Sequence, residues 1–380
     1  MTYADANIVI NVNLAPTTGV TQDFSTILLL VDEAEGTGNT LDGDRFREYT
    51  SITAANADRA DTFITVAVLQ AISDFFSQTP RLQKIIVGRV DTAAAEVYAG
   101  AVTGGLELCI AGGANFYGVC IDKRTTAEIK VVSSAIEALD FYLFVLQSAD
   151  ADWLTTGFPA ALAALSGRQR TVICYHDIAT EWMDVCYAGA RLRPNPDQIS
   201  GSWPGALDEV LDYTTPITTG GQGFAFINGV NLGMLYGAAS FYVGPGYNAE
   251  ASGDGLALGR PVHQVVTADW YKTRLRERVT ALVLQFSNRN EKIVMGIAGQ
   301  TNTPGQVAFA GAANGILLQG ERGKSPHFVP GQTKVTTEAL TAADITAEEL
   351  RFKVEGTFAQ NARTFEYNVF LGLTAVNPTA

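Results

Sequence analysis

Charged side chains are scarce in this 380-residue sequence. Asp, Glu, Lys and Arg make up only 17% of it, whereas an average soluble domain carries about 25%. Hydrophobic residues account for 47%, and the length allows two or three domains, each with its own core. A surface so poor in charge is either neutral and rich in Thr, Asn and Gly, or buried by neighbouring copies, because the centres of interfaces are depleted in charge. Composition alone leaves both explanations open.

Positive charge is the scarcer sign. The sequence has 26 Lys and Arg against 39 Asp and Glu, a net charge of −13. Because nucleic-acid binding needs a basic surface, we expect no DNA or RNA partner. Long apolar runs are missing as well. A run such as 27–31 is far shorter than the roughly 18 residues of a membrane span, so we expect no membrane partner, and no secretory signal is recognised in the first residues.

Cysteine and histidine, which build many metal and nucleophile sites, are few. The cysteines are Cys109, Cys120, Cys174 and Cys186, and the histidines are His176, His263 and His327. No two cysteines have the Cys-x2-Cys spacing of a zinc site, so free, buried thiols in a reducing compartment are expected. Neither a G-x-G-x-x-G between a strand and a helix nor a P-loop occurs. The sequence therefore predicts no metal and no cofactor.

The cluster Cys174-Tyr175-His176-Asp177 is the one group that could suggest catalysis. It ends a predicted strand, and α/β enzymes place catalytic residues at the carboxyl ends of strands. However, Cys174 and His176 share one face of the strand without the separate orienting group that a nucleophile needs. We interpret them as a packed thiol and a loop histidine, and predict that the protein is not an enzyme.

Strands and helices alternate between about residues 62 and 190. Strands are predicted at 84–90, 116–121, 141–147 and 171–175, after an earlier one at 26–31, and helices at 61–77, 93–111, 126–139 and 159–165. Alternation of this kind implies βαβ units on a mostly parallel sheet. The sequence predicts an α/β domain over 21–195.

A second, α+β domain is predicted over 196–363. The region 194–223 is rich in Pro and Gly, which favours a boundary there. Two strands and two helices are expected beyond it. They lie at 223–228, 235–243, 267–286 and 303–318, with Thr267 and Thr303 as the helix caps.

Two terminal strands lie outside both domains, in an N-terminal arm (1–20) and a C-terminal arm (364–380). In each, apolar residues alternate with polar ones, as in a half-buried strand. The apolar positions are Ile8, Ile10, Val12 and Leu14 in the first arm and Phe365, Tyr367, Val369 and Leu371 in the second. Each arm could pair within its own chain, either in a hairpin with a neighbouring strand or as an ordinary edge strand. Alternatively, each arm could add as a strand to a sheet of another subunit.

The energetics of lending an arm are close to balanced. Ordering eight residues costs on the order of 8–16 kcal/mol. About four ladder hydrogen bonds return roughly 2–6 kcal/mol, and four buried apolar side chains return roughly 6–12 kcal/mol. The binding of a single arm to a neighbouring subunit is therefore only marginally stable. Two arms that bind to neighbours already positioned in a lattice would give a stable contact.

Positive charge is concentrated in one segment. The segment from Arg260 to Lys292 contains seven basic and three acidic residues, a local charge of +4. These side chains could flank an apolar helical stripe with solvated heads, or form a basic face for an acidic partner. The candidates for such a face are Lys272, Arg274, Arg276 and Arg278. Helical spacing groups them as Arg274 with Arg278 and Lys272 with Arg276.

Several stretches resemble the tail sheath proteins of contractile-tailed (myovirus) phages, and their order and spacing span most of the chain. They are Ile8-Val-Ile-Asn-Val-Asn-Leu14, the segment 182–203 with Ala-Gly-Ala-Arg, the segment 244–285 with Asp269-Trp-Tyr-Lys, the Gly-rich helix at 305–320, and Asn361-Ala-Arg-Thr-Phe-Glu-Tyr-Asn-Val-Phe370. One departure is Ser287-Asn-Arg-Asn-Glu-Lys292, where many sheath proteins have an apolar segment that ends in a Pro-Tyr-like turn.

The resemblance implies a structural subunit of a phage virion, assembled in the host cytoplasm. Such subunits form stacked six-fold rings around an inner tube, and both arms add strands to a sheet in neighbouring subunits. Contraction then moves subunits as rigid bodies and drives the tube through the host envelope. The expected partners are other copies of the chain and the tail tube, baseplate and tail terminator proteins, with the basic face of the 267–286 helix turned toward the tube.

Two other classes of function stay open. An α/β enzyme of unknown chemistry would show a cleft with converging polar groups. Another virion structural protein, such as a tube or capsid protein, is the second alternative, although the α/β pattern of 62–190 disfavours a tube protein, since those are mainly β.

Overall fold

The computed structural model describes most of the chain. The described residues are 7–8, 22–32, 41–79, 81–100, 102–155, 159–193, 205–235, 241–244, 262–288, 299–321, 331, 333–337, 339, 342 and 352–355.

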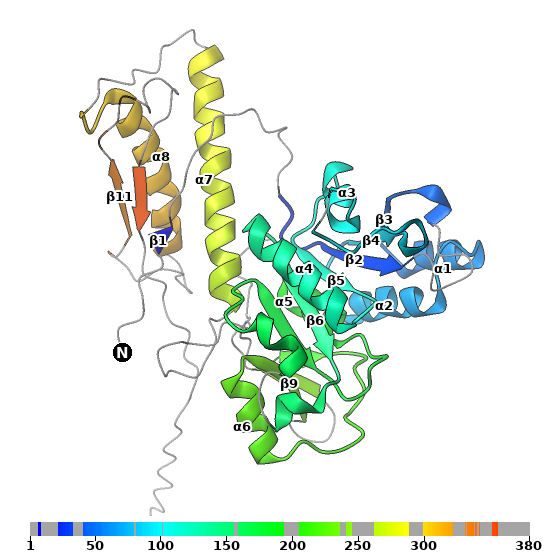
Figure 1. The fold of residues 1–380 in the computed structure, drawn as a ribbon. Helices are drawn as coiled ribbons and strands as arrows, with labels where there is room; N and C mark the ends of the chain where they lie inside the picture. Colours follow the sequence, from blue (N-terminus) through cyan, green and yellow to red (C-terminus); the bar gives the residue numbers. More distant parts are fainter. Residues whose placement is uncertain are drawn as a thin grey trace, which may run out of the picture.

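A nine-stranded mixed sheet forms the centre of the fold (Figure 1). Its spatial order is β3-β4-β2-β5-β6-β7-β9-β10-β8. The strands are β2 Ile27–Asp32, β3 Phe46–Tyr49, β4 Ile85–Val90, β5 Gly118–Ile121, β6 Leu143–Ser148, β7 Thr171–Tyr175, β8 Gly205–Leu207, β9 Val230–Leu235 and β10 Phe241–Gly244. The run from β4 to β9 is parallel, and β3, β10 and β8 pair antiparallel with their neighbours. The predicted α/β class with a mostly parallel sheet is confirmed.

Helices cover both faces of this sheet, which explains why its central strands are almost continuously apolar. The helices are α1 Ile52–Ala60, α2 Val66–Ser77, α3 Gly105–Ala111, α4 Thr126–Leu139, α5 Met183–Arg191 and α6 Thr219–Ile227, with short 3-10 helices at Leu41–Gly43, Thr92–Ala94, Ala151–Leu154 and Ala160–Leu165. Alternate residues of β2 divide between two cores: Leu29 joins the core under α2 and α5, and Leu30 joins the core under α3 and α4.

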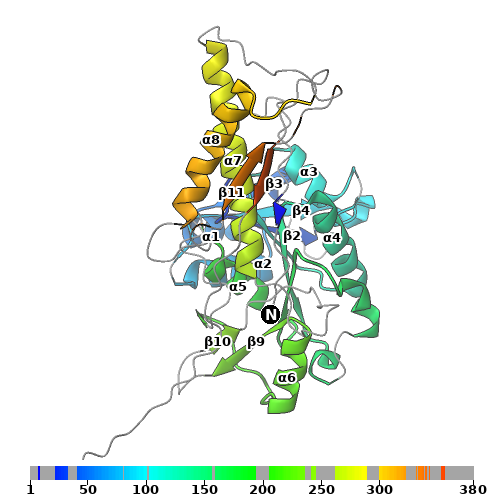
Figure 2. The same cartoon turned by 90° about the vertical axis from the view of Figure 1, so that its left-hand side faces the viewer.

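A smaller unit stands beside the sheet (Figures 1 and 2). It consists of α8 Pro304–Glu321 and a three-stranded antiparallel sheet of order β1-β12-β11, formed by Asn7–Ile8, Phe352–Glu355 and Lys334–Thr337. Helix α7, Val262–Asn288, packs against α8 and reaches the α/β domain at its N-terminal end. Its 27 residues span about 40 Å, so one continuous helix links the small unit to the large sheet.

Local signals placed several elements correctly. Helix α4 and strand β7 have the predicted bounds, and β2 starts one residue later than predicted. At α8, the Thr303 hydroxyl accepts a hydrogen bond from the Gln306 backbone N–H at 3.4 Å, and the Gln306 side chain accepts one from the Thr303 N–H at 3.1 Å. This capping box confirms the predicted start of the helix.

Other elements differ from prediction. The segment 223–228, predicted as a strand, lies in α6, because the Thr218 hydroxyl accepts a hydrogen bond from Gly221 N–H and caps a helix there. The helix predicted over 93–111 is α-helical only from Gly105, since the 3-10 turn Thr92–Ala94 ends at Ala95, which adopts a left-handed φ of +62°. The helix predicted over 61–77 begins only at Val66, as α2 with Thr65 as its cap, and α1, which Ser51 caps, was not predicted.

Helix α7 begins before its predicted cap. Thr267 lies inside the helix and is buried, and the helix starts at Val262. Val262 and Val266 pack into the core under α2 and α5, so burial against the α/β domain extends the helix beyond its local signal.

The predicted domain boundary at 195 falls within one sheet. Strand β9 pairs in parallel with β7, and β10 and β8 follow it. In strand pairing, residues 205–244 therefore continue the α/β sheet, although local composition assigned them to the second domain.

Candidate assembly interface

Strand β11 is an edge strand of the small sheet. β12 lies in the middle and pairs antiparallel with β11 over four residues and with β1 over two. Within the described part of the chain, no strand pairs with the outer edge of β11. Such an edge presents backbone N–H and C=O groups that can accept a further strand.

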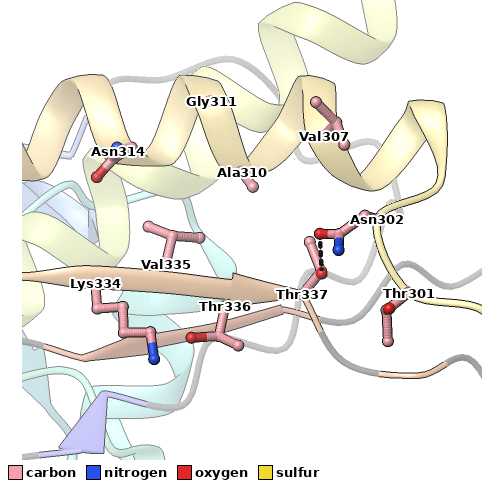
Figure 3. Close-up of a pocket in the computed structure, with 10 residues that line it drawn as sticks. All are labelled: Thr301, Asn302, Val307, Ala310, Gly311, Asn314, Lys334, Val335, Thr336 and Thr337. Atoms are coloured by element: carbon pink, nitrogen blue, oxygen red, sulfur yellow. Dashed lines mark hydrogen bonds between the residues drawn. The ribbon is translucent and has the colours of Figure 1, made fainter.

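A groove of about 570 Å³ runs between β11 and α8 (Figure 3). Its lining residues are Thr301, Asn302, Val307, Ala310, Gly311, Asn314, Lys334, Val335, Thr336 and Thr337. Val335 points toward α8, and the Thr337 hydroxyl donates a hydrogen bond to Asn302 Oδ1 at 2.7 Å, whereas Lys334 and Thr336 point to the other side of the strand. An open edge beside a groove with an apolar floor offers both requirements of strand addition, a ladder and a place for alternate side chains.

The predicted arm residues lie mostly outside the described residues. Of the eight, only Ile8 is described: it lies in β1, opposite Val354 of the same chain. The other seven are Ile10, Val12, Leu14, Phe365, Tyr367, Val369 and Leu371. β1 thus shows pairing within the chain over two residues, worth only about 1–3 kcal/mol if each pair forms one ladder hydrogen bond. Pairing between subunits stays a prediction.

The four basic candidates on α7 have different surroundings. Lys272 Nζ lies 3.5 Å from Asp140 Oδ2, at the end of α4. The Arg274 guanidinium stacks over the Trp270 ring and donates to Glu277 at 2.6 Å, and Arg278 is exposed. The side chain of Arg276 lies outside the described residues. Lys272 is therefore engaged with the α/β domain, Arg274 with neighbours on its own helix, and Arg278 is exposed to a partner.

The Cys174 and His176 side chains are both fully buried. His176 Nδ1 accepts a hydrogen bond from Ile178 N–H at 3.1 Å, so the neutral ring carries its proton on Nε2 and donates it to the Leu211 carbonyl at 2.8 Å. Burial raises the pKa of Cys174 well above its usual value, which keeps the thiol protonated and poorly nucleophilic. The structure thus gives both residues packing roles, as the sequence predicts.

Replacing these two residues should change stability and not assembly. Cys174→Ala removes one buried heavy atom and should cost about 1 kcal/mol. His176→Ala should cost more, about 1–3 kcal/mol for each buried backbone group that loses its partner. Denaturant unfolding measures both. An assembly defect in a variant that is as stable as the parent protein would contradict this prediction.

The sheet has a topological switch point beside β2, where open α/β sheets commonly bind ligands. Sequence reasoning did not single out its two carboxylates, although each stands at the end of an apolar strand. Thr92 Oγ1 donates to both oxygens of Asp32 at 2.7 and 2.8 Å, and Lys123 Nζ lies 3.4 Å from the same carboxylate. Asp122 accepts from the Tyr98 hydroxyl and from the Asp32 backbone N–H. The polar side chains at this switch point therefore form hydrogen bonds and an ion pair with one another.

Among the described residues, no group of three or more His, Cys, Asp or Glu side chains has the arrangement of a metal site. None of the described helices is both long and apolar enough to cross a membrane.

This chain resembles known proteins in its fold but not in its sequence. No family model matches this sequence, and no curated protein matches it significantly. Solved structures do match over nearly the full length. A chain of the contracted helical sheath of the anti-feeding prophage has a TM-score of 0.61 at 13% identity, covering 97% of this chain and 99% of that one. A sheath tail protein from Listeria innocua has a TM-score of 0.56 at 9% identity, covering 91% and 96%.

The chain has the fold of contractile tail sheath proteins. A chain of the six-fold symmetrised baseplate of the anti-feeding prophage also shares this sheath fold, with a TM-score of 0.62, 12% identity and coverage of 96% and 98%. Identities of 9–13% explain why no sequence match exists. The fold is shared although few residue identities are.

Proposed function

We propose that this chain is the structural subunit of a contractile sheath and has no catalytic role. The observation that carries the proposal is the extent of the fold match. It covers 97% of this chain and 99% of a sheath chain from the anti-feeding prophage. The matched length therefore takes in the α/β domain, the linking helix α7 and the small sheet together.

Subunits of this kind would polymerise as stacked six-fold rings around an inner tail tube. Contraction would then drive the tube through the host envelope during genome ejection. The partners would be other copies of this chain, the tail tube protein, and the baseplate and tail terminator proteins, in a virion assembled in the host cytoplasm. The match to a chain in a six-fold symmetrised assembly supports the ring symmetry.

The two edges of the small sheet suggest where the arms of neighbouring subunits bind. Within the chain, β1 of the N-terminal arm pairs with β12, so in strand exchange the N-terminal arm of a neighbour would take the place of β1 beside β12. The outer edge of β11, beside the groove, would take the C-terminal arm of another neighbour. Phe365, Tyr367, Val369 and Leu371 of that arm alternate with polar residues, so one face of the added strand would be apolar. During contraction the arms would serve as hinges between rigid subunits.

Negative-stain microscopy of the purified protein tests this function. We expect it to polymerise into hollow tubes with six-fold end views, because each subunit carries both the arms and the edges that receive them. A protein that stays monomeric up to high concentration, with or without a tail tube, would overturn the proposal.

We predict that Arg274 and Arg278 face the tube. Exposed ion pairs contribute only about 0–1 kcal/mol each, so a ring of six subunits could hold the tube and still release it on contraction. The double variant Arg274→Gln/Arg278→Gln should bind tubes more weakly and with a smaller salt dependence, as measured by co-sedimentation.

The matched control for this pair is Arg81→Gln. Arg81 is exposed and stacks over Phe76 of α2 in the α/β domain. It should leave tube binding unchanged. If an assembled structure places neither Arg274 nor Arg278 at the smallest radius, the basic face serves contacts between subunits instead.

A further inference from the structure

A buried ionic cluster connects α7 to the α/β domain. Arg170, which precedes β7, donates two hydrogen bonds to Asp269 of α7, at 2.5 and 3.0 Å. The Tyr117 hydroxyl, next to β5, donates to the same carboxylate at 2.8 Å. Arg170 also donates two hydrogen bonds to Asp140 Oδ1 at the end of α4, and Lys272 of α7 reaches Asp140 at 3.5 Å. We call these five residues the Arg170 cluster.

The cluster holds α7 by geometry as well as by charge. Two positive and two negative groups balance within it, and Asp269 and Tyr117 are fully buried. Burial alone would lower the pKa of Arg170, but its hydrogen bonds to Asp269 raise that pKa well above its usual value. Burial also raises the pKa of Asp269, and the hydrogen bond and charge of Arg170 oppose this rise. The planar guanidinium binds two carboxylates from two helices in a fork geometry. Because Asp269 and Lys272 lie one turn apart on α7 and both contact the cluster, the contact restrains the direction of the helix axis.

Apolar contacts at the base of α7 do not supply the same restraint. Val262 and Val266 pack into the core under α2 and α5, with Trp270 half-buried against it. Apolar burial is largely non-directional, so these contacts fix the position of the helix better than its angle. From Asp269 to Asn288 the helix runs about 28 Å. A tilt of about 10° at the cluster would therefore displace its far end by about 5 Å.

We infer that the Arg170 cluster is an orientation lock that makes the α/β domain, α7 and the unit of α8 and the small sheet move as one rigid body. The lock sets the direction in which the edge of β11 and its groove face. It concerns the isolated chain, and it holds whether or not the chain forms a sheath.

Pulsed electron–electron double resonance tests the lock in the full chain. Spin labels would be placed on exposed positions of α4 and α8 with Ala127→Cys and Gln319→Cys. The native cysteines are buried and should not react, and dilution with unlabelled protein removes distances between subunits. We expect one narrow distance distribution in the parent protein. In Arg170→Met, and in the near-isosteric Asp269→Asn, it should become at least twofold broader.

Two controls separate orientation from stability. Arg170→Met/Asp269→Met leaves no unpaired charge, so its unfolding midpoint should recover relative to Arg170→Met while its distance distribution stays broad. Arg124→Met breaks a comparable pair with Asp184 inside the α/β domain. It should lower the unfolding midpoint and leave the distribution narrow. The inference is overturned if the double variant is narrow, or if Arg124→Met broadens the distribution as much as Arg170→Met does.

Discussion

Deleting residues 364–380 or residues 1–15 is expected to abolish polymers and to leave a folded α/β core. The core survives because its two buried clusters draw on residues between Phe24 and Val266, none of them in either deleted segment. Polymers are lost because each arm would return little more than the roughly 8–16 kcal/mol that ordering it costs, so the lattice needs both. Circular dichroism and thermal unfolding measure the fold, and negative-stain microscopy measures the polymers.

A finer pair of variants tests the two faces of the C-terminal arm. Val369→Lys/Leu371→Lys places charges on the apolar face and should act like the deletion. Glu366→Gln/Asn368→Gln alters the polar face and should assemble as the parent protein does. Normal assembly of either truncated protein would show that the arms do not pair between subunits.

Filling the groove beside β11 should also abolish polymers. Gly311 lines the groove, and a Cβ at this position would meet nothing within 4 Å. Gly311→Leu therefore fits the folded chain and should raise its stability by up to about 1 kcal/mol, since Gly is a poor helix former. The added side chain would occupy the space that the side chains of an added strand need. Polymer yield in negative-stain images should fall to background while the unfolding midpoint rises slightly.

Gly315→Leu is the matched control. Gly315 lies one turn further along α8, is exposed, and also has open space at a Cβ, but it is not among the groove's lining residues. Its substitution carries the same gain in helix propensity, and we expect unchanged polymers. Tubes formed normally by Gly311→Leu would show that the groove receives no strand.

Several features of the candidate interface were accessible from the sequence. The alternation around Ile8 and around Val369 predicts strands with one apolar face, and the local charge predicts a basic face among Lys272, Arg274, Arg276 and Arg278. The bounds and the edge position of β11 were not predicted, because Lys334-Val-Thr-Thr337 is a short segment whose role depends on its partner β12. The groove was missed for the same reason, since α8 and β11 meet only in the folded chain.

The sequence by itself determined the α/β class, since continuous apolar strands alternating with amphipathic helices can be buried only in a parallel sheet covered on both faces. It also determined the capping box of α8, which depends on neighbours close in sequence. Only the tertiary structure decided that β9 continues the sheet beside β7, that α7 begins at Val262, and that Arg170 meets Asp269. Ile173 of β7 pairs with Val230 of β9, 57 positions further along the chain, and Arg170 and Asp269 are 99 positions apart. No local pattern encodes which surfaces so distant in sequence will bury one another.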